Sequence, residues 1–326
     1  MEYSNYYCMN HRSRNAVLDI VIPVYQEESH IVKSINVIKD ILDNSKISHK
    51  FILVDDGSKD NTWVQLKILA DTNHNVTAIR LSRNFGKEAA ICAGIQYSEG
   101  DMLVVMDSDL QHPPSLIPEM VRFWREEGFD VIEGVKRTRG KENKAYRYCA
   151  NLFYKFIYKT STIDLRNASD FKLLDKKVVT AWRSMEEKTT FFRGMSAWVG
   201  FNRKQIYFDV GDRVDGNTKW SLTRLIKLAI NATTSYTTIP LQFISILGVI
   251  LLVISFILGI QTIIMKIIGN ALDGFTTVII LLLLIGSCIM ISLGIIGVYL
   301  AKIYHEVKGR PRYLVSVCIK EGKEIC

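Results

Sequence analysis

Two acidic motifs in the first half of the chain combine residue types and spacing that could handle a diphosphate. Asp107 and Asp109 are separated by one residue, and Gln111 follows them closely. Carboxylates two positions apart on a loop can hold one hard divalent cation, which stabilises the negative charge that develops on a leaving diphosphate. Asp55 and Asp56 begin an earlier Asp-Asp-Gly-Ser motif, whose carboxylates could accept hydrogen bonds from a base or a ribose.

Each motif alone also has a simpler explanation. The residues at 55–58 are turn formers and could make a turn with an acidic helix cap. Two acids spaced by one residue arise often by chance. Each motif, however, directly follows a short apolar run of the kind that forms a buried strand. Two such motifs at the ends of two strands indicate a ligand site much more strongly than either motif does alone.

The elements that would position these motifs alternate between strand and helix. Short apolar runs predict strands that are buried on both faces, at Leu18–Val24, Phe51–Val54, Val76–Leu81, Met102–Met106 and Val131–Glu133. The stretches between them predict helices at Glu27–Asp43, Thr62–Ala70, Lys87–Ser98 and Ser115–Glu127. This alternation predicts a doubly wound α/β domain with a Rossmann-like, mostly parallel sheet, in which ligands bind beyond the carboxyl ends of the strands.

Several other classes of active site lack their motifs in this sequence. No GxGxxG or GxxxxGK[ST] stands at a strand–helix junction, which argues against dinucleotide oxidoreductases and P-loop NTPases. The six histidines form no HExxH zinc motif, and no GxSxG nucleophile elbow occurs. The six cysteines show no CxxC spacing, so we expect free thiols in a reducing compartment.

The segment at 136–160 is basic and rich in aromatic residues, and the whole chain has a formal net charge of +8. Aromatic rings between cations would suit single-stranded nucleic acid, and a helix on a membrane surface fits the same pattern. A solvated helix with aromatic core contacts is a third explanation. The long apolar runs farther along the chain favour a lipid or phosphorylated partner over nucleic acid.

Two runs without a charged residue, Leu241–Met265 and Gly274–Ala301, follow in the last third of the chain. Each exceeds the ~20 residues that a helix needs to cross a bilayer. Lysines and arginines flank the pair on both outer sides, whereas the connection at 266–273 carries one lysine and one aspartate. Both chain ends are therefore expected on the cytoplasmic side. An amphipathic stretch at 220–239 predicts an interfacial helix that leads into the first span.

The motifs together resemble those of the family 2 glycosyltransferases of GT-A fold. The first stretches that carry this resemblance are Val21–Glu28, Asp55–Ser58 with Asp60 and Thr62, Arg83–Lys87 and Asp107–Pro114. Later stretches are similar to the polyisoprenyl-phosphate branch of the family, namely Ser169–Asp175, Arg193–Gly194 with Trp198 and Gly200, and Arg213–Trp220. That branch includes dolichyl-phosphate mannose synthase and bacterial bactoprenol glucosyltransferases, and its bacterial members typically carry a C-terminal pair of membrane helices.

The resemblance implies a role for each matching residue. The nucleoside pocket would be lined by Pro23, Tyr25, Glu27, Asp55 and Asp56. Mg²⁺ or Mn²⁺ would be held by Asp107, Asp109 and Gln111. The donor diphosphate and the lipid phosphate would face Arg137, Arg147, Arg213 and Lys219. The residues expected to carry catalysis are Asp107, Asp109, Arg213 and Lys219. Two positions depart from the common family pattern, Ser108 in the middle of the DxD motif and Gln26 in the first loop.

The predicted segments of the chain, in order, are an N-terminal tail (1–16), a cytoplasmic GT-A domain (17–219), the interfacial helix (220–239), two transmembrane helices (240–301, with spans at 241–265 and 275–301) and a cytoplasmic C-terminal tail (302–326). The N-terminus shows no secretory signal, which agrees with a catalytic domain that stays in the cytoplasm.

The activity implied is inverting transfer of a sugar from a nucleotide sugar, a UDP-sugar first, to polyprenyl (undecaprenyl) phosphate. Glucose is the first expectation and N-acetylglucosamine the next. The setting would be the cytoplasmic face of a bacterial membrane, with cell-envelope glycan modification as the purpose. Two alternatives stay open: a processive polysaccharide synthase of the same fold, and a non-catalytic membrane protein that binds lipid. The QxxRW motif of the former is absent around Trp182. No nucleic-acid partner is expected, and a homo-oligomer is compatible with this interpretation.

Overall fold

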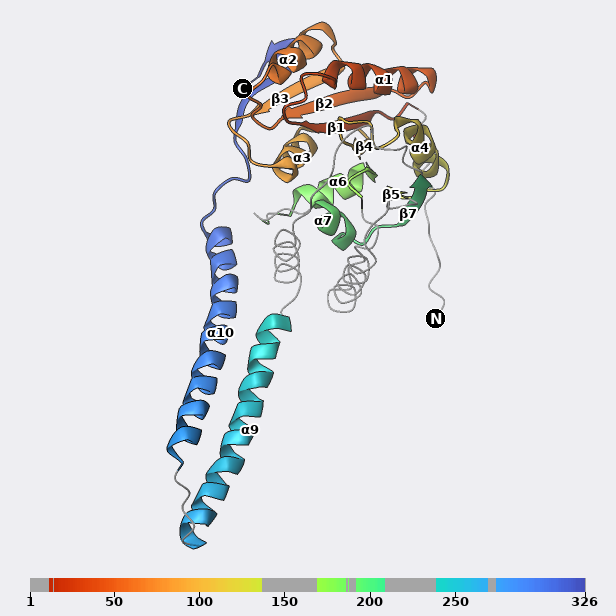
Figure 1. Cartoon of the computed structure of the whole chain (residues 1–326). Coiled ribbons are helices and arrows are strands. Elements are labelled where there is room, and N and C mark those ends of the chain that lie inside the picture. Colours follow the sequence, from red (N-terminus) through yellow and green to blue (C-terminus); the bar gives the residue numbers. More distant parts are fainter. Residues whose placement is uncertain are drawn as a thin grey trace, which may run out of the picture. The chain divides into compact units, whose positions relative to one another are not determined.

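The computed structural model describes residues 12–13, 15–136, 169–185, 187, 192–208, 239–268 and 274–325. The chain forms two compact units. One contains the sheet and the shorter helices, and the other contains the two long apolar helices (Figure 1). The interfacial helix expected at 220–239 and the basic segment at 137–160 lie outside the described residues.

The first unit begins with alternating strands and helices, as the sequence predicts. In chain order they are β1 (Leu18–Val24), α1 (Ile31–Asn44), β2 (His49–Asp55), α2 (Thr62–Thr72), β3 (Val76–Leu81), α3 (Lys87–Tyr97) and β4 (Met102–Val105). A short 3-10 turn (Pro114–Leu116) then leads into α4 (Ile117–Glu126). The remaining elements are β5 (Val131–Lys136), β6 (Lys172–Asp175), α6 (Lys176–Arg183), α7 (Phe192–Trp198), β7 (Arg203–Phe208), β8 (Val315–Lys320) and β9 (Lys323–Glu324).

These strands form one mixed sheet in the order β7-β5-β6-β4-β1-β2-β3-β8-β9. The strands β4, β1, β2 and β3 run parallel to one another, and β5 is parallel to β7. The strand β6 lies between β4 and β5 and is antiparallel to both. The carboxyl ends of β1, β2 and β4 therefore meet at the same edge of the sheet, which is where the acidic motifs follow. The predicted doubly wound α/β fold is confirmed.

Helices cover both faces of this sheet (Figure 1). The helices α1, α2 and α4 bury residues such as Ile35, Leu66 and Met120 against one face. The helices α3, α6 and α7 bury Ile91, Val178 and Phe192 against the other. Such all-round burial explains why the central strands are continuous apolar runs rather than alternating ones.

One close approach fixes how α3 packs on the sheet. Gly94 lies in α3, and a Cβ atom there would stand 2.3 Å from Cγ1 of Val21 in β1. Only glycine allows this helix to pack so closely against the strand without a shift. The position of α3 matters for function because its first residue, Lys87, extends toward the acidic loop that follows β4.

The C-terminal stretch differs from the expected tail (302–326). The strand β8 pairs antiparallel with β3, so that Thr77 stands opposite Lys320 and Ile79 opposite Cys318. Cys318 and Ile319 are buried in the two cores. The chain thus returns to the first unit after the long helices and covers the open edge of β3. We expected no element here because the run is short and separated from the rest of the sheet by more than two hundred residues of chain.

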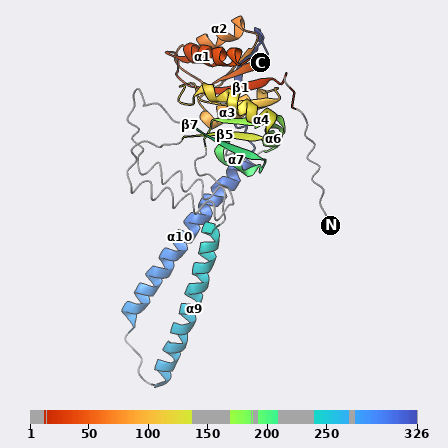
Figure 2. The ribbon, with the colours of Figure 1, turned by 90° about the vertical axis from the view of Figure 1, so that its right-hand side faces the viewer.

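The second unit contains α9 (Ile239–Ile268) and α10 (Phe275–Val307), which run side by side (Figure 2). Both helices contain stretches long and apolar enough to cross a membrane, Leu241–Met265 with a mean hydropathy of 3.0 and Leu284–Val307 with 2.2. These stretches are unburied within the structure, and large side chains such as Leu252 and Phe256 are exposed. The two predicted apolar helices are therefore present, and many of their large apolar side chains are exposed among the described residues.

Candidate active site

The first acidic motif, Asp55–Ser58, begins at the last residue of β2. Asp55 is the last residue of that strand, and its carboxylate is fully buried. One carboxylate oxygen accepts a hydrogen bond from the Ser58 backbone nitrogen at 2.9 Å, and Arg80 Nε lies 3.4 Å from the other. Burial raises the pKa of Asp55, while the bonds to Ser58 and the charge of Arg80 oppose that rise. Asp55 therefore shapes the turn at the edge of the sheet.

Asp56 binds the loop that leads into α3. Its two carboxylate oxygens accept hydrogen bonds from the backbone nitrogens of Phe85 at 2.7 Å and Gly86 at 2.8 Å. Gly57, with a φ of 70°, packs so closely on this loop that a Cβ atom would stand 2.6 Å from the Arg83 carbonyl carbon. Asp56 thus fixes the loop just before Lys87. A contact of Asp55 or Asp56 with a nucleoside stays a prediction.

The first loop of the sheet brings a third carboxylate toward the site. Pro23 is partly buried in β1, and Tyr25 is exposed at the end of that strand. The carboxylate of Glu27 pairs with the His30 imidazole. Burial raises the pKa of Glu27, the His30 ring opposes the rise, and the negative charges of Asp109 and Asp107 add to it. The charges of Glu27 and the two acids of the DxD motif therefore influence one another, and a shared ligand site for them stays a prediction.

The DxD motif follows β4 on a tight loop. Leu110 has a φ of 56°, and Asp109 accepts a hydrogen bond from the Gln111 backbone nitrogen at 3.0 Å. The buried His112 ring lies parallel to Phe171, with ring centroids 5.2 Å apart, and its Nδ1 is 3.5 Å from the Asp107 backbone nitrogen. Burial lowers the pKa of His112. The loop is anchored by this ring, while the Asp109 side chain stays free of the core.

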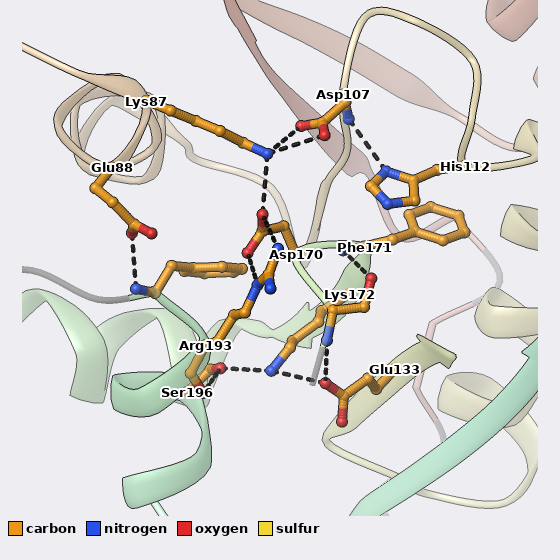
Figure 3. A network of polar contacts seen from close by, with 12 residues as sticks. Lys87, Glu88, Asp107, His112, Glu133, Asp170, Phe171, Lys172, Arg193 and Ser196 are labelled. Atoms are coloured by element: carbon orange, nitrogen blue, oxygen red, sulfur yellow. Dashed lines mark hydrogen bonds and ion pairs between the residues drawn. The ribbon is translucent and has the colours of Figure 1, made fainter. Parts of the chain in front are cut away.

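A network of charges joins the DxD motif to helix α7 (Figure 3). Lys87 Nζ lies 2.6 and 2.9 Å from the two carboxylate oxygens of Asp107, and 2.9 Å from Oδ2 of Asp170. Arg193, on α7, binds Asp170 through two hydrogen bonds of 2.7 and 2.9 Å. Burial alone would raise the pKa of Asp170, but Arg193 and Lys87 outweigh it and hold that pKa far below its usual range.

A second group of charges, centred on the buried pair Lys172 and Glu133, lies next to this network (Figure 3). Lys172 Nζ is 3.0 Å from Oε1 of Glu133 and donates a 2.8 Å hydrogen bond to Ser196 on α7. Glu133 also pairs with Arg203 at 3.0 Å and accepts a hydrogen bond from the Ser169 backbone nitrogen at 3.0 Å. Burial lowers the pKa of Lys172, and the charge of Glu133 opposes that shift. This group ties α7, which carries Arg193, to β5 and β6.

The donor atoms on the DxD loop suit a hard divalent cation. Asp107 and Asp109 present carboxylate oxygens, which are the ligands that Mg²⁺ prefers, and Gln111 lies on the same loop. Within the described ranges, no three His, Cys, Asp or Glu side chains converge as they would around a fully protein-bound ion. Two loop carboxylates fit an ion that takes its other oxygens from water and from substrate phosphates.

The four expected phosphate ligands do not belong to the part of the chain that the structure describes. They are Arg137, Arg147, Arg213 and Lys219. The structure instead brings together Lys87, Asp170 and Arg193, which stand in the motifs that carry the family resemblance but received no role. Their opposite charges are visible in the sequence. Nothing in the sequence, however, shows that residues so far apart along the chain meet, because that depends on where β6 and α7 are placed.

Comparison with known proteins identifies the family to which this chain belongs. Residues 19–181 match the sequence model of the family described as Glycosyl transferase family 2. An uncharacterized glycosyltransferase of Synechocystis sp. is 39% identical over 302 residues, which cover 92% of this chain and 94% of that protein. A prophage bactoprenol glucosyl transferase homolog of Escherichia coli is 31% identical over 301 residues, which cover 92% of this chain and 98% of that protein.

Among solved structures, glucosyl-3-phosphoglycerate synthase from Mycobacterium tuberculosis, crystallised with Mn²⁺, uridine diphosphate and phosphoglyceric acid, aligns with a TM-score of 0.46. The two share 18% sequence identity, and the alignment covers 67% of this chain and 76% of that one. Half of the present sequence matches the family model. Both relatives named above align with the present sequence over nearly their full length. The chain is therefore a glycosyltransferase that belongs to glycosyl transferase family 2.

Proposed function

We propose that this glycosyltransferase moves one sugar from a UDP-sugar to a polyprenyl phosphate such as undecaprenyl phosphate. Glucose is the first candidate sugar and N-acetylglucosamine the next. The observation that carries the proposal is the loop after β4, where Asp107 and Asp109 form a carboxylate pair on a chain with two helices long and apolar enough to cross a bilayer. The name of the Escherichia coli relative supports both the lipid acceptor and the first candidate sugar.

The reaction we propose is a single inverting displacement. An oxygen of the lipid phosphate attacks the anomeric carbon of the sugar while the bond from that carbon to the diphosphate breaks, and the nucleoside diphosphate leaves with the bonding electrons. A phosphate monoester has a second pKa of about 6 and is largely dianionic at neutral pH. The acceptor therefore needs no strong general base. The work left to the protein is positioning and neutralisation of charge.

The proposed division of labour follows the charges in the chain. Asp107, Asp109 and Gln111 would hold Mg²⁺ or Mn²⁺, which supplies Lewis-acid stabilisation of the leaving diphosphate. The proposed nucleoside pocket consists of Pro23, Tyr25, Glu27, Asp55 and Asp56. The proposed ligands of the diphosphate and the lipid phosphate are Arg137, Arg147, Arg213 and Lys219. Arginine and lysine form strong charge-assisted hydrogen bonds with phosphate, which suits them to this role.

The proposed location is the cytoplasmic face of a bacterial membrane, with both chain ends inside. Two apolar helices joined by a short connection would cross the bilayer and return. The flanks of the pair carry more lysine and arginine than the connection does, and this bias sets orientation. A transferase held in this way would keep its active site on the side where nucleotide sugars are made. The product would then serve cell-envelope glycan modification.

The test is a direct assay of the product. The full-length protein in detergent is incubated with undecaprenyl phosphate, Mn²⁺ and, in separate reactions, UDP-glucose, UDP-N-acetylglucosamine and GDP-mannose, and the lipid is analysed by mass spectrometry. With UDP-glucose, we expect a lipid that carries one added hexose. We expect no lipid that carries two or more sugars. Asp109→Asn is the matched control, because it removes one charge from an exposed loop and leaves the core intact.

Each other outcome contradicts a stated part of the proposal. Addition of several sugars to one lipid would identify a processive synthase. Transfer from another donor only would overturn the choice of sugar and leave the lipid acceptor standing. No product with any donor, together with unchanged nucleotide sugar, would favour the non-catalytic lipid-binding alternative. Full activity of Asp109→Asn would remove the DxD loop from catalysis.

A further inference from the structure

We propose that Lys87 is a tethered counter-ion that occupies the metal-binding carboxylate of Asp107 in the free enzyme and passes to the donor diphosphate when the cation binds. The inference rests on the proposed function, because it takes Asp107 as a metal ligand. It adds a residue to the donor site and predicts that metal and nucleotide bind cooperatively.

The geometry of Lys87 is that of a cation in the place of a metal. Its Nζ lies 2.6 Å from Oδ1 and 2.9 Å from Oδ2 of Asp107, so the ammonium bridges both carboxylate oxygens (Figure 3). A divalent ion bound to Asp107 would approach the same oxygens to about 2.0–2.6 Å. A cation bound to these oxygens would repel the neighbouring ammonium. Metal binding would therefore favour movement of Lys87 away from Asp107.

The position of Lys87 is unfavourable for a purely structural lysine. It is the first residue of α3, where the unpaired backbone N–H groups create a positive field. A helix start normally favours an acidic residue or a small polar one. The cation is retained because it faces two carboxylates, Asp107 and Asp170. Each of those lies outside α3, so the lysine serves the site rather than its own helix.

After Lys87 leaves Asp107, its other partner in the described network is Asp170, which already binds Arg193. Asp170 is buried and accepts two hydrogen bonds from Arg193, which nearly satisfy it. The Lys87 side chain is 41% exposed and can therefore change rotamer toward the solvent side. The nearest strong anion that arrives together with the metal is the diphosphate of the donor. Its oxygens would take the ammonium that the metal displaces.

This exchange has a thermodynamic consequence. Without nucleotide, a metal ion must compete with Lys87 for Asp107, and its binding is weak. With a nucleoside diphosphate present, Lys87 has another anion to pair with, and metal binding strengthens. By reciprocity, the metal strengthens nucleotide binding by the same factor. Coupling of this kind typically amounts to about 5- to 150-fold in affinity.

The test measures Mn²⁺ affinity of the full-length protein in detergent by the electron paramagnetic resonance of free Mn²⁺, with and without uridine diphosphate. We expect Lys87→Met to bind Mn²⁺ alone at least fivefold more tightly than the wild type. We also expect uridine diphosphate to strengthen Mn²⁺ binding by a smaller factor in this variant. Lys87→Arg keeps the charge and should retain weak binding of Mn²⁺ alone. The wild type and these two variants are compared at equal concentrations of folded protein, checked by urea unfolding.

Lys320→Met is the matched control, because Lys320 pairs with Glu99 at 2.6 Å on strand β8, outside this network. It should leave both affinities unchanged. Unchanged or weaker Mn²⁺ binding by Lys87→Met would overturn the proposal while the transfer assay still supports the function. No Mn²⁺ binding by the wild type, with or without uridine diphosphate, would overturn both the metal assignment and this inference. If Lys87→Met does not fold, the Mn²⁺ affinities of Lys87→Arg and of a folded Lys87→Gln variant are compared instead. Mn²⁺ binding by Lys87→Arg that is as tight as that by Lys87→Gln, or tighter, would refute the proposal.

Discussion

Replacement of Glu133 by glutamine should destabilise the protein more than replacement of its partner Lys172 by methionine. The two groups are unequally supported. Without Lys172, Glu133 keeps Arg203 and the Ser169 backbone nitrogen, each at 3.0 Å. Without the charge of Glu133, the fully buried Lys172 ammonium keeps neutral acceptors, the Ser196 hydroxyl and the amide oxygen of the new glutamine. A buried cation with neutral partners in place of a carboxylate is the costlier state.

The magnitude has a ceiling set by proton chemistry. Removal of one partner from a buried ion pair typically costs about 3–5 kcal/mol. The stranded ammonium can also become neutral by losing its proton. At pH 7 that costs about 4.6 kcal/mol, from an ordinary lysine pKa of about 10.4 and 1.36 kcal/mol per pH unit. We therefore expect a loss of about 3–4.6 kcal/mol for Glu133→Gln, and roughly 3 kcal/mol or less for Lys172→Met.

The pH dependence separates this explanation from a general packing defect. Burial already lowers the pKa of Lys172, and loss of the Glu133 charge should lower it further. Between the folded and unfolded pKa values, the unfolded chain then binds more protons than the folded one. Stability of Glu133→Gln should consequently rise as pH increases from 7 toward 10, by up to about 1.4 kcal/mol per pH unit. Lys172→Met has no such lysine and should not gain stability in this way.

The assay is urea unfolding of the full-length protein in detergent at pH 7, 8 and 9, followed by tryptophan fluorescence. All five tryptophans precede the first apolar helix, so the signal reports the part of the chain before it. Wild type and the double variant Lys172→Met/Glu133→Gln complete a double-mutant cycle. An equal or larger loss in Lys172→Met, or a deficit of Glu133→Gln that stays constant between pH 7 and 9, would refute the reasoning.

Three further outcomes are expected. Asp109→Asn should abolish transfer with no change in the urea midpoint, and a chelator should stop the wild type until Mn²⁺ or Mg²⁺ is restored; full activity in the chelator would contradict the metal assignment. Asn270→Cys should react with a membrane-impermeant thiol reagent in intact cells, whereas labelling of Cys326 alone would reverse the orientation. Arg213→Ala and Lys219→Ala should each slow transfer by roughly a hundredfold or more. Calorimetry should show that both variants still bind uridine diphosphate, and near-normal transfer would remove them from the site.

Much of the first unit could be predicted because each core strand is a short apolar run that can be recognised from its own residues. The limits of β1 and β3 agree with the apolar runs at 18–24 and 76–81. Strand β6 gave no such pattern, since it is four residues long and contains the buried Lys172. That lysine is tolerated only because Glu133 lies on the neighbouring strand β5. The sequence around Lys172 does not show that Glu133 is its partner.

The same limit explains what was found and missed in the candidate site. The position of the DxD motif at the end of β4 follows from a short-range pattern, and so does the turn after β2. The contact of Lys87 with Asp170 depends on the insertion of β6 beside β4, which is a property of the whole sheet. The engagement of Asp56 by the backbone of Phe85 and Gly86 also depends on tertiary packing.

The return of the chain to the sheet in β8 has a consequence for biogenesis. The edge of β3 is covered by residues that are synthesised after both α9 and α10. During translation that edge stays open while the two apolar helices emerge, and an open strand edge is a template for pairing with other chains. The pairing of Thr77 with Lys320 also closes a very long loop, and such distant contacts form late. Under the proposed membrane location, the sheet would be completed after the helices insert, and a chain whose hairpin fails to insert would expose an unfinished edge to quality-control proteases and chaperones.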